Sequence, residues 1–142
     1  GVSEILRSEV PLLRDLGVLA DWRLIRGDER FFAVTKSIHN ALQGADLILT
    51  AGERAEYIEH SKLNAAELND DYDVIVVHDP QPLPMHSYHP SGDARWIWRC
   101  HIDTSAPNAA VWEFLREFVA SYDAAVFTAQ AFEIRTPRII LI

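Results

Sequence analysis

Residues 73–80 read Asp-Val-Ile-Val-Val-His-Asp-Pro, and this stretch decides the fold. The consecutive β-branched residues Val74–Val77 are typical of a strand buried on both faces of a parallel sheet. Pro80 ends the strand, because proline has no backbone N–H to donate to a neighbouring strand. In open parallel sheets, ligands bind beyond the carboxyl ends of the strands. His78 and Asp79 are therefore the first candidates for a binding site.

A second polar cluster follows the next predicted strand along the chain. Trp96–Trp98 reads as a strand, and Arg99, His101 and Asp103 come directly after it. Since the carboxyl ends of parallel strands meet at one edge of a sheet, we expect the two clusters to converge on one crevice. Imidazole can donate or accept a hydrogen bond and carboxylates accept from hydroxyl groups, which suits a polyhydroxy ligand.

The rest of the chain alternates helical and strand patterns. Helices are predicted at Val2–Leu16, Phe31–Leu42 and Gly52–Leu68, and from Asn108 to about Ser121. Further strands are predicted at Val18–Ile25, Ala124–Phe127 and Ile139–Ile142, and the proline-rich stretch Pro80–Gly92 is predicted to be a loop or one short broken helix. This alternation indicates an α/β fold with a Rossmann-like parallel sheet and helices on both faces.

The helix predicted at Phe31–Leu42 carries a third polar group near its end. Its members are Lys36, His39, Asn40 and Gln43. Lys36, Asn40 and Gln43 share one helical face through their spacing of four and three residues. From spacing alone, a solvated helix face explains this group better than a binding site.

Composition excludes several classes of function. The 142 residues carry a formal net charge of -8, and an acidic surface repels nucleic-acid phosphates. No run of apolar residues is long enough to span a membrane, and no signal-peptide pattern is visible. Cys100 is the one cysteine, so no disulfide can form within the chain, and we expect a cytoplasmic protein. Six histidines are present, but without a His-Glu-x-x-His pattern or a cysteine pair we expect no metal site.

Three blocks of sequence, in this order, resemble the glycosyltransferring trehalose synthases of glycosyltransferase family 4. They are Phe31–Gly44 (FFAVTKSIHNALQG), Val77–Pro82 (VHDPQP) and Trp96–Asp103 (WIWRCHID). The opening Gly1–Leu6 resembles the helix that follows the family's glycine-rich loop. Two segments depart from the family pattern, Leu83–Arg95 and Thr128–Thr136.

The resemblance implies a GT-B fold, in which two Rossmann-like domains face a cleft. Residues 1–142 are then expected to form the single N-terminal, acceptor-side domain, without its first strand and without the C-terminal nucleotide-sugar domain. The implied reaction transfers glucose from an NDP-glucose to free glucose with retention, giving trehalose reversibly; ADP, UDP and GDP all remain open as the nucleotide. No cofactor is implied and Mg²⁺ is not indicated. We expect this chain alone to be inactive.

The resemblance also assigns roles to residues. His101 matches the family histidine at the reaction centre, where it is expected to hydrogen-bond near the transferred sugar rather than attack it. The other residues expected to bind substrate are Gly1, Lys36, His39, Asn40, Gln43, His78, Asp79, Arg99 and Asp103.

Two other functions remain open from the sequence. One is a catalytically inactive sugar-binding module that kept only the acceptor half. The other is an oligomerisation module, such as a homodimer, since a missing strand leaves a sheet edge with unpaired backbone groups.

Overall fold

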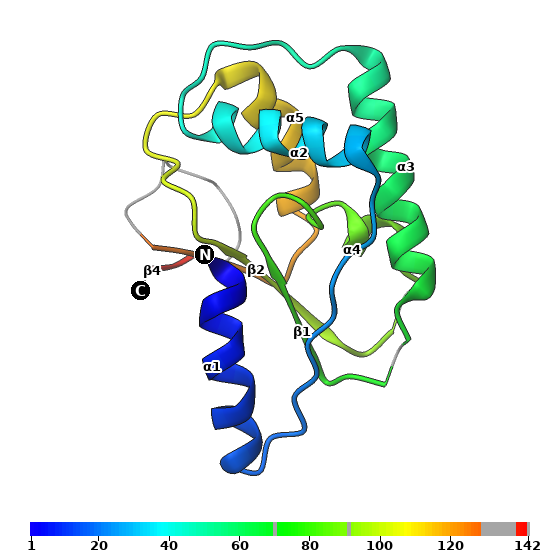
Figure 1. Ribbon diagram of the computed structural model, residues 1–142, viewed down its shortest axis with the longest axis vertical. Helices are drawn as coiled ribbons and strands as arrows, with labels where there is room; N and C mark the ends of the chain where they lie inside the picture. Colours follow the sequence, from blue (N-terminus) through cyan, green and yellow to red (C-terminus); the bar gives the residue numbers. More distant parts are fainter. Residues whose placement is uncertain (70, 91, 129–138, 142) are drawn as a thin grey trace.

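The computed structural model describes residues 1–69, 71–90, 92–128 and 139–141. Helices and strands alternate along the chain, as predicted for an α/β fold (Figure 1). The elements are α1 (Val2–Asp15), α2 (Glu29–Leu42), α3 (Ala51–Glu67), β1 (Val74–His78), α4 (Met85–Tyr88), β2 (Arg95–Cys100), α5 (Ala109–Val119), β3 (Ala124–Phe127) and β4 (Ile139–Leu141).

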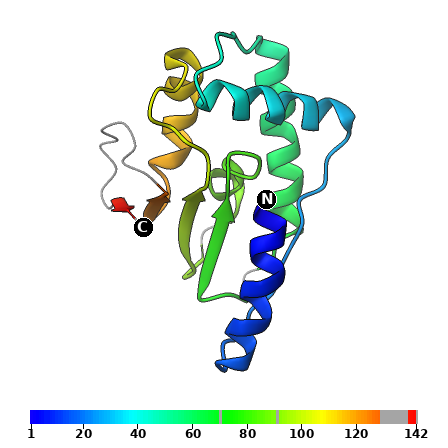
Figure 2. The same cartoon turned by 60° about the vertical axis from the view of Figure 1, so that its left-hand side comes forward.

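The strands form one parallel sheet in the order β1-β2-β3-β4 (Figure 2). The register pairs His78 with Arg99, and Arg99 with Val126. The last residues of β1 and β2 therefore lie at the same edge of the sheet. Both polar clusters predicted from the sequence follow at this edge.

One face of the sheet carries the hydrophobic core. Val77, Trp98 and Ala125 are aligned across three strands and are all buried. They belong to one core cluster with Ile38 of α2 and Leu115 of α5. Burial of these large apolar side chains removes them from water, which is the main favourable contribution to folding. The face packed against α2, α3 and α5 thus holds the domain together.

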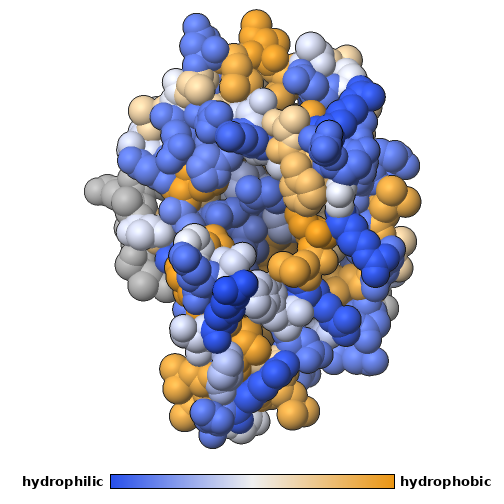
Figure 3. Space-filling model, viewed as in Figure 1, coloured by the Kyte–Doolittle hydropathy of each residue, from blue (hydrophilic) through white to orange (hydrophobic). Residues whose placement is uncertain are grey.

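The opposite face is only lightly covered. Val74 and Val76, which point to it, are 51% and 47% exposed, so the prediction that Val74–Val77 is buried on both faces is wrong. Burial alternates along the strand because only one of its two faces packs on the core. α1 lies apart from the other helices on this side and has no buried residue (Figures 1 and 2). Figure 3 shows apolar side chains gathered over α1 at the lower end of the molecule.

The predicted strand Val18–Ile25 is wrong. This segment has no regular secondary structure, and Leu19 and Leu24 are 98% and 75% exposed. Its alternating sequence favours an extended backbone, but a strand also needs a neighbouring edge to bond with. The segment is instead tied down at its ends, by Arg14 Nε donating to Ala20 O over 2.7 Å and by Arg26 N donating to Asn64 Oδ1 over 2.7 Å.

The other predicted elements are confirmed to within a few residues. α1 ends where Gly17 adopts a φ of 86°, a left-handed conformation that glycine accepts without strain. The short α4 lies in the proline-rich stretch. Ile142 and nearly all of Thr128–Thr136 lie outside the described residues. None of the described helices combines the length and the hydropathy that crossing a membrane requires.

Asn108 joins two parts of the fold through its side chain. Its Oδ1 accepts from Ala110 N and Val111 N, both at 3.1 Å, and so caps α5. Its Nδ2 donates to Ala45 O at 3.1 Å and Leu47 O at 3.0 Å, in the loop after α2. One side chain therefore fixes the start of α5 against that loop.

Replacing this side chain tests its importance for stability. Asn108→Ala is expected to lower the free energy of unfolding by about 2 kcal/mol, since the helix cap and two carbonyl partners are lost together. Asn108→Asp keeps the cap but loses the donor, so it should fall between wild type and Asn108→Ala. Urea titration measures all three, and equal midpoints for the three proteins would contradict this assignment.

Candidate functional site

Asp79 fastens the ends of β1 and β2 together. Its N–H donates to Arg99 O at 2.9 Å, and its Oδ1 accepts from His101 N at 2.7 Å. Its carbonyl accepts from Trp98 Nε1 at 2.8 Å. The residue has a φ of 62°, a left-handed conformation that aspartate tolerates better than most residues. These bonds fix where the chain goes after each strand, and thus where His101 lies.

His78 and His101 are in direct contact across the two strands. Nδ1 of His78 lies 2.9 Å from Nε2 of His101, a hydrogen-bond distance. Burial lowers the pKa of both rings. For His78 the neighbouring His101 lowers it further, whereas the Asp79 carboxylate partly offsets the effect in both. Both rings are therefore neutral near pH 7.

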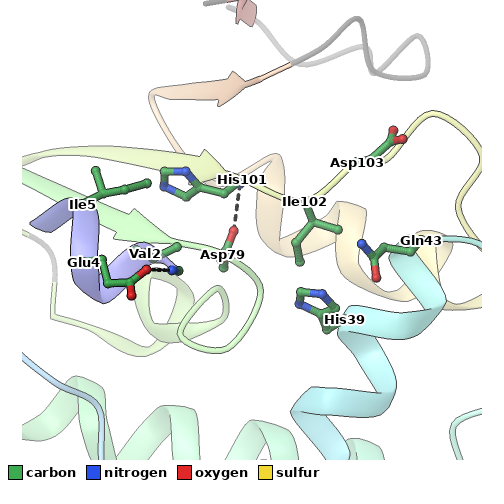
Figure 4. Close-up of a pocket in the computed structure, with 10 residues that line it drawn as sticks. Val2, Glu4, Ile5, His39, Gln43, Asp79, His101, Ile102 and Asp103 are labelled. Atoms are coloured by element: carbon green, nitrogen blue, oxygen red, sulfur yellow. Dashed lines mark hydrogen bonds and ion pairs between the residues drawn. The ribbon is translucent and has the colours of Figure 1, made fainter.

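A pocket of about 380 Å³ opens at this edge of the sheet (Figure 4). A volume of this size is at the lower end of those of small-molecule sites. Four segments line it: the start of α1, the end of α2, the turn after β1 and the loop after β2. The lining residues are Gly1, Val2, Glu4, Ile5, His39, Gln43, Asp79, His101, Ile102 and Asp103.

The polar lining is acidic or neutral. Its carboxylates come from Glu4, Asp79 and Asp103. A hydrogen bond from Ser105 N, 2.9 Å from Oδ1, holds the pKa of Asp103 below its usual value. The described lining includes no lysine or arginine side chain. Such a surface offers many acceptors for hydroxyl groups and no side-chain cation for a phosphate.

The structure brings together six of the ten residues predicted for the site: Gly1, His39, Gln43, Asp79, His101 and Asp103. His78 touches His101 but does not line the pocket. Arg99 also lies outside the lining, and its Nη1 donates to Cys100 O at 3.3 Å. Lys36 and Asn40 are exposed on α2 outside the pocket. The end of α2 therefore reaches the pocket through His39 and, one turn later, through the C-cap residue Gln43.

Sequence reasoning missed four of the lining residues: Val2, Glu4, Ile5 and Ile102. A signal was present for the first three, since they lie in the first turns of a helix whose N-cap is the predicted residue Gly1. Ile102 lies between two predicted residues, His101 and Asp103. Cys100 is buried, and burial raises the pKa of its thiol to about 12, so it is not an activated nucleophile.

A second cluster, Asp28, Glu56 and His60, could hold a metal ion by distance alone. His60 Nδ1 lies 3.2 Å from Glu56 Oε1, and His60 Nε2 lies 3.9 Å from Asp28 Oδ1. Both carboxylates already have protein partners, because Asp28 caps α2 through Phe31 N and Glu56 pairs with Arg30. These contacts explain the cluster as a set of polar interactions that holds α2 against α3.

The histidines of the proline-rich stretch pack in the structure. The rings of His86 and His89 lie 4.8 and 5.3 Å from Trp96, measured between centroids. His86 Nδ1 is 2.9 Å from Ser121 Oγ. Their positions are explained by packing against the end of the sheet opposite to the pocket.

Comparison with known proteins gives a consistent family. The family described as "Trehalose synthase, N-terminal domain" matches residues 1–134. The trehalose synthase of Rubrobacter xylanophilus is 48% identical over 139 residues, which cover 93% of this chain and 33% of that protein. The trehalose synthase of Thermococcus litoralis is 48% identical over 129 residues, covering 89% of this chain and 31% of that protein. That of Pyrococcus horikoshii is 45% identical over 129 residues. The chain spans about one-third of the length of these relatives.

Substitutions of Asp79 test the combined contribution of its side-chain hydrogen bond and its left-handed backbone. Asp79→Ala loses the bond to His101 N and leaves alanine in a left-handed conformation, whereas Asp79→Asn keeps an acceptor and tolerates that conformation. Asp79→Ala is therefore expected to be less stable than Asp79→Asn by about 1–2 kcal/mol in urea unfolding. Equal stability of the two variants would show that the side chain does not fasten the strands.

The lowered histidine pKa values predict a pH dependence of stability. The unfolded chain binds protons near the ordinary value of 6.5, while the folded pKa values of His78, His86 and His101 are lower. Their contribution is present above pH 6.5 and is lost as the pH falls below it, because the unfolded state then binds more protons. Urea unfolding should show a decline between pH 7.5 and 5.5, well above the range in which carboxylates titrate. A flat profile over this interval would contradict the burial of these rings.

Proposed function

This chain belongs to the trehalose synthase N-terminal domain family, and we propose that it forms the acceptor-binding side of a retaining glycosyltransferase. In this proposal, glucose is transferred reversibly from an NDP-glucose to a free glucose, and the product is trehalose. The residues at the edge of the sheet bind the acceptor glucose.

One observation carries the proposal: the pocket of about 380 Å³ is lined by carboxylates, histidines and an amide, and by no described basic side chain. These groups can accept and donate hydrogen bonds to several sugar hydroxyls at once. Of the groups that bind a nucleotide diphosphate, the described lining offers the N–H groups at the start of α1, next to the Glu4 carboxylate, and no basic side chain. The pocket therefore suits the neutral acceptor better than the charged donor.

Each pocket residue then has a part in orienting the acceptor. The neutral ring of His101 lies next to the sugar that reacts, with its main chain held by Asp79. Asp103 accepts from hydroxyl groups, and His39 and Gln43 contact the sugar from α2. Such orientation accelerates transfer by holding the attacking hydroxyl near the donor carbon.

The leaving diphosphate needs electrostatic stabilisation in the transition state. Relatives named trehalose synthase are about three times as long as this chain. We assign donor binding to the remaining two-thirds of such a protein.

A second candidate function is a catalytically inactive sugar-binding or oligomerisation module. The same absence of basic side chains from the described lining favours it, together with the exposed leucines of α1, Leu12 and Leu16. Turnover separates the two candidates, because only the first produces trehalose from NDP-glucose and glucose when a donor-binding domain is joined to this chain. Light scattering tests whether this chain forms a dimer.

Titration of this chain with sugar tests the first part of the proposal. Glucose and trehalose at millimolar concentration are expected to shift amide signals of His39, Asp79, His101 and Asp103, while an NDP-glucose shifts them no more than glucose does. His101→Ala should weaken glucose binding about 2- to 10-fold, the effect of losing one hydrogen bond. Lys62→Ala, an exposed residue on α3, is the control and should bind as wild type does. A dispersed spectrum that no sugar changes would refute the proposal.

A further inference from the structure

The rings of His78 and His101 meet edge to edge. Their centroids are 5.2 Å apart and their planes differ by 13°, while Nδ1 of His78 is only 2.9 Å from Nε2 of His101. A separation of 2.9 Å is a hydrogen-bond length and too short for stacked faces. The contact is therefore a bond between two ring nitrogens.

This bond couples the protonation of the two rings. A neutral imidazole has one nitrogen that donates and one that accepts. If Nδ1 of His78 carries its proton, Nε2 of His101 must be bare, and the proton of His101 lies on its own Nδ1. If Nε2 of His101 carries the proton, its Nδ1 is bare. In either case the two tautomers are linked: the remaining nitrogen of His101 donates when Nδ1 of His78 donates, and accepts when Nδ1 of His78 accepts.

The surroundings keep the pair in place. His78 is the last residue of β1, its backbone is paired with Arg99, and its ring is partly buried. His101 is held through its backbone N–H by Asp79. The charged groups near the two rings are Glu9 of α1, Asp79 and Arg99. Figure 4 shows the His101 ring turned toward Ile5 of α1, between the helix and the strand ends.

Only one of the two histidines lines the pocket. His101 does so and His78 does not. We propose that His78 is a positioning residue, which fixes the tautomer of His101 and so sets the hydrogen bond that His101 offers to the sugar. This replaces direct sugar binding by His78, which the sequence alone had predicted. The part of this inference that concerns the sugar rests on the proposed function. The part that concerns the tautomer does not, because the tautomer can be measured without a ligand.

Two substitutions of His78 separate positioning from packing. His78→Phe keeps a ring but has no nitrogen, whereas His78→Asn places an amide near the position of Nδ1 and can still donate or accept. His86→Phe is the matched control, since His86 is another partly buried histidine whose pKa burial lowers, bonded to Ser121 instead. Dispersed amide spectra verify that each variant folds.

The readout is the tautomer of His101 in long-range proton–nitrogen NMR spectra of this chain at pH 7.5. Wild type, His78→Asn and His86→Phe are each expected to show a single His101 tautomer, and His78→Phe a mixture of two. Glucose affinity should fall about 2- to 10-fold in His78→Phe and recover in His78→Asn.

An unchanged single tautomer in His78→Phe would overturn the inference. A loss of glucose affinity in both His78 variants with an unchanged His101 tautomer would also overturn it, and would mean that His78 contacts the sugar directly. If wild type binds no sugar, the proposed function fails, and the tautomer measurement still decides the role of His78.

Discussion

Asp79 is the constraint on which the site depends. Its three hydrogen bonds join the turn after β1 to the end of β2 and to the following loop. They also require a left-handed backbone at a residue other than glycine, which only a well-determined surrounding maintains. Because the carbonyl accepts from buried Trp98, the turn is anchored in the hydrophobic core. The geometry of a polar pocket is in this way tied to apolar packing.

The two faces of the sheet contribute differently to stability and to the pocket. The face on α2, α3 and α5 contains the core cluster and supplies the stability. The other carries α1, whose side chains are not buried and whose first turn lines the pocket. The wall formed by the strand ends is held by the hydrogen bonds of Asp79, whereas α1 buries no residue in the described structure.

The sequence predicted correctly the helices and strands that local residue patterns determine. Its predictions failed where contacts with distant parts of the chain determine the structure. Apolar spacing located α2, α3 and α5, and Asn108 marked the start of α5 as a cap. Val18–Ile25 has a strand-like pattern, but no pattern shows whether an edge is available to it. The carboxyl-end rule brought His101, Asp79 and Asp103 to one place. Helical spacing alone favoured a solvated face for Lys36 and Asn40, which are exposed outside the pocket, and only the family resemblance placed them at the site. The hydrogen bond between His78 and His101 depends on the register of the two strands, which cannot be read from the sequence.

The outer edge of β1 has a consequence for handling the protein in solution. No described strand pairs with it, and its exposed valines lie between Asp71, Asp73 and Asp79. Flanking charges of one sign keep such edges of separate molecules apart by repulsion. This repulsion has a range of about 10 Å at 0.1 M ionic strength and shrinks to about 3 Å at 1 M. The tendency of this chain, with its net charge of -8, to aggregate therefore depends on the ionic strength of its buffer. Concentrated salt screens the repulsion that keeps the β1 edges of separate molecules apart.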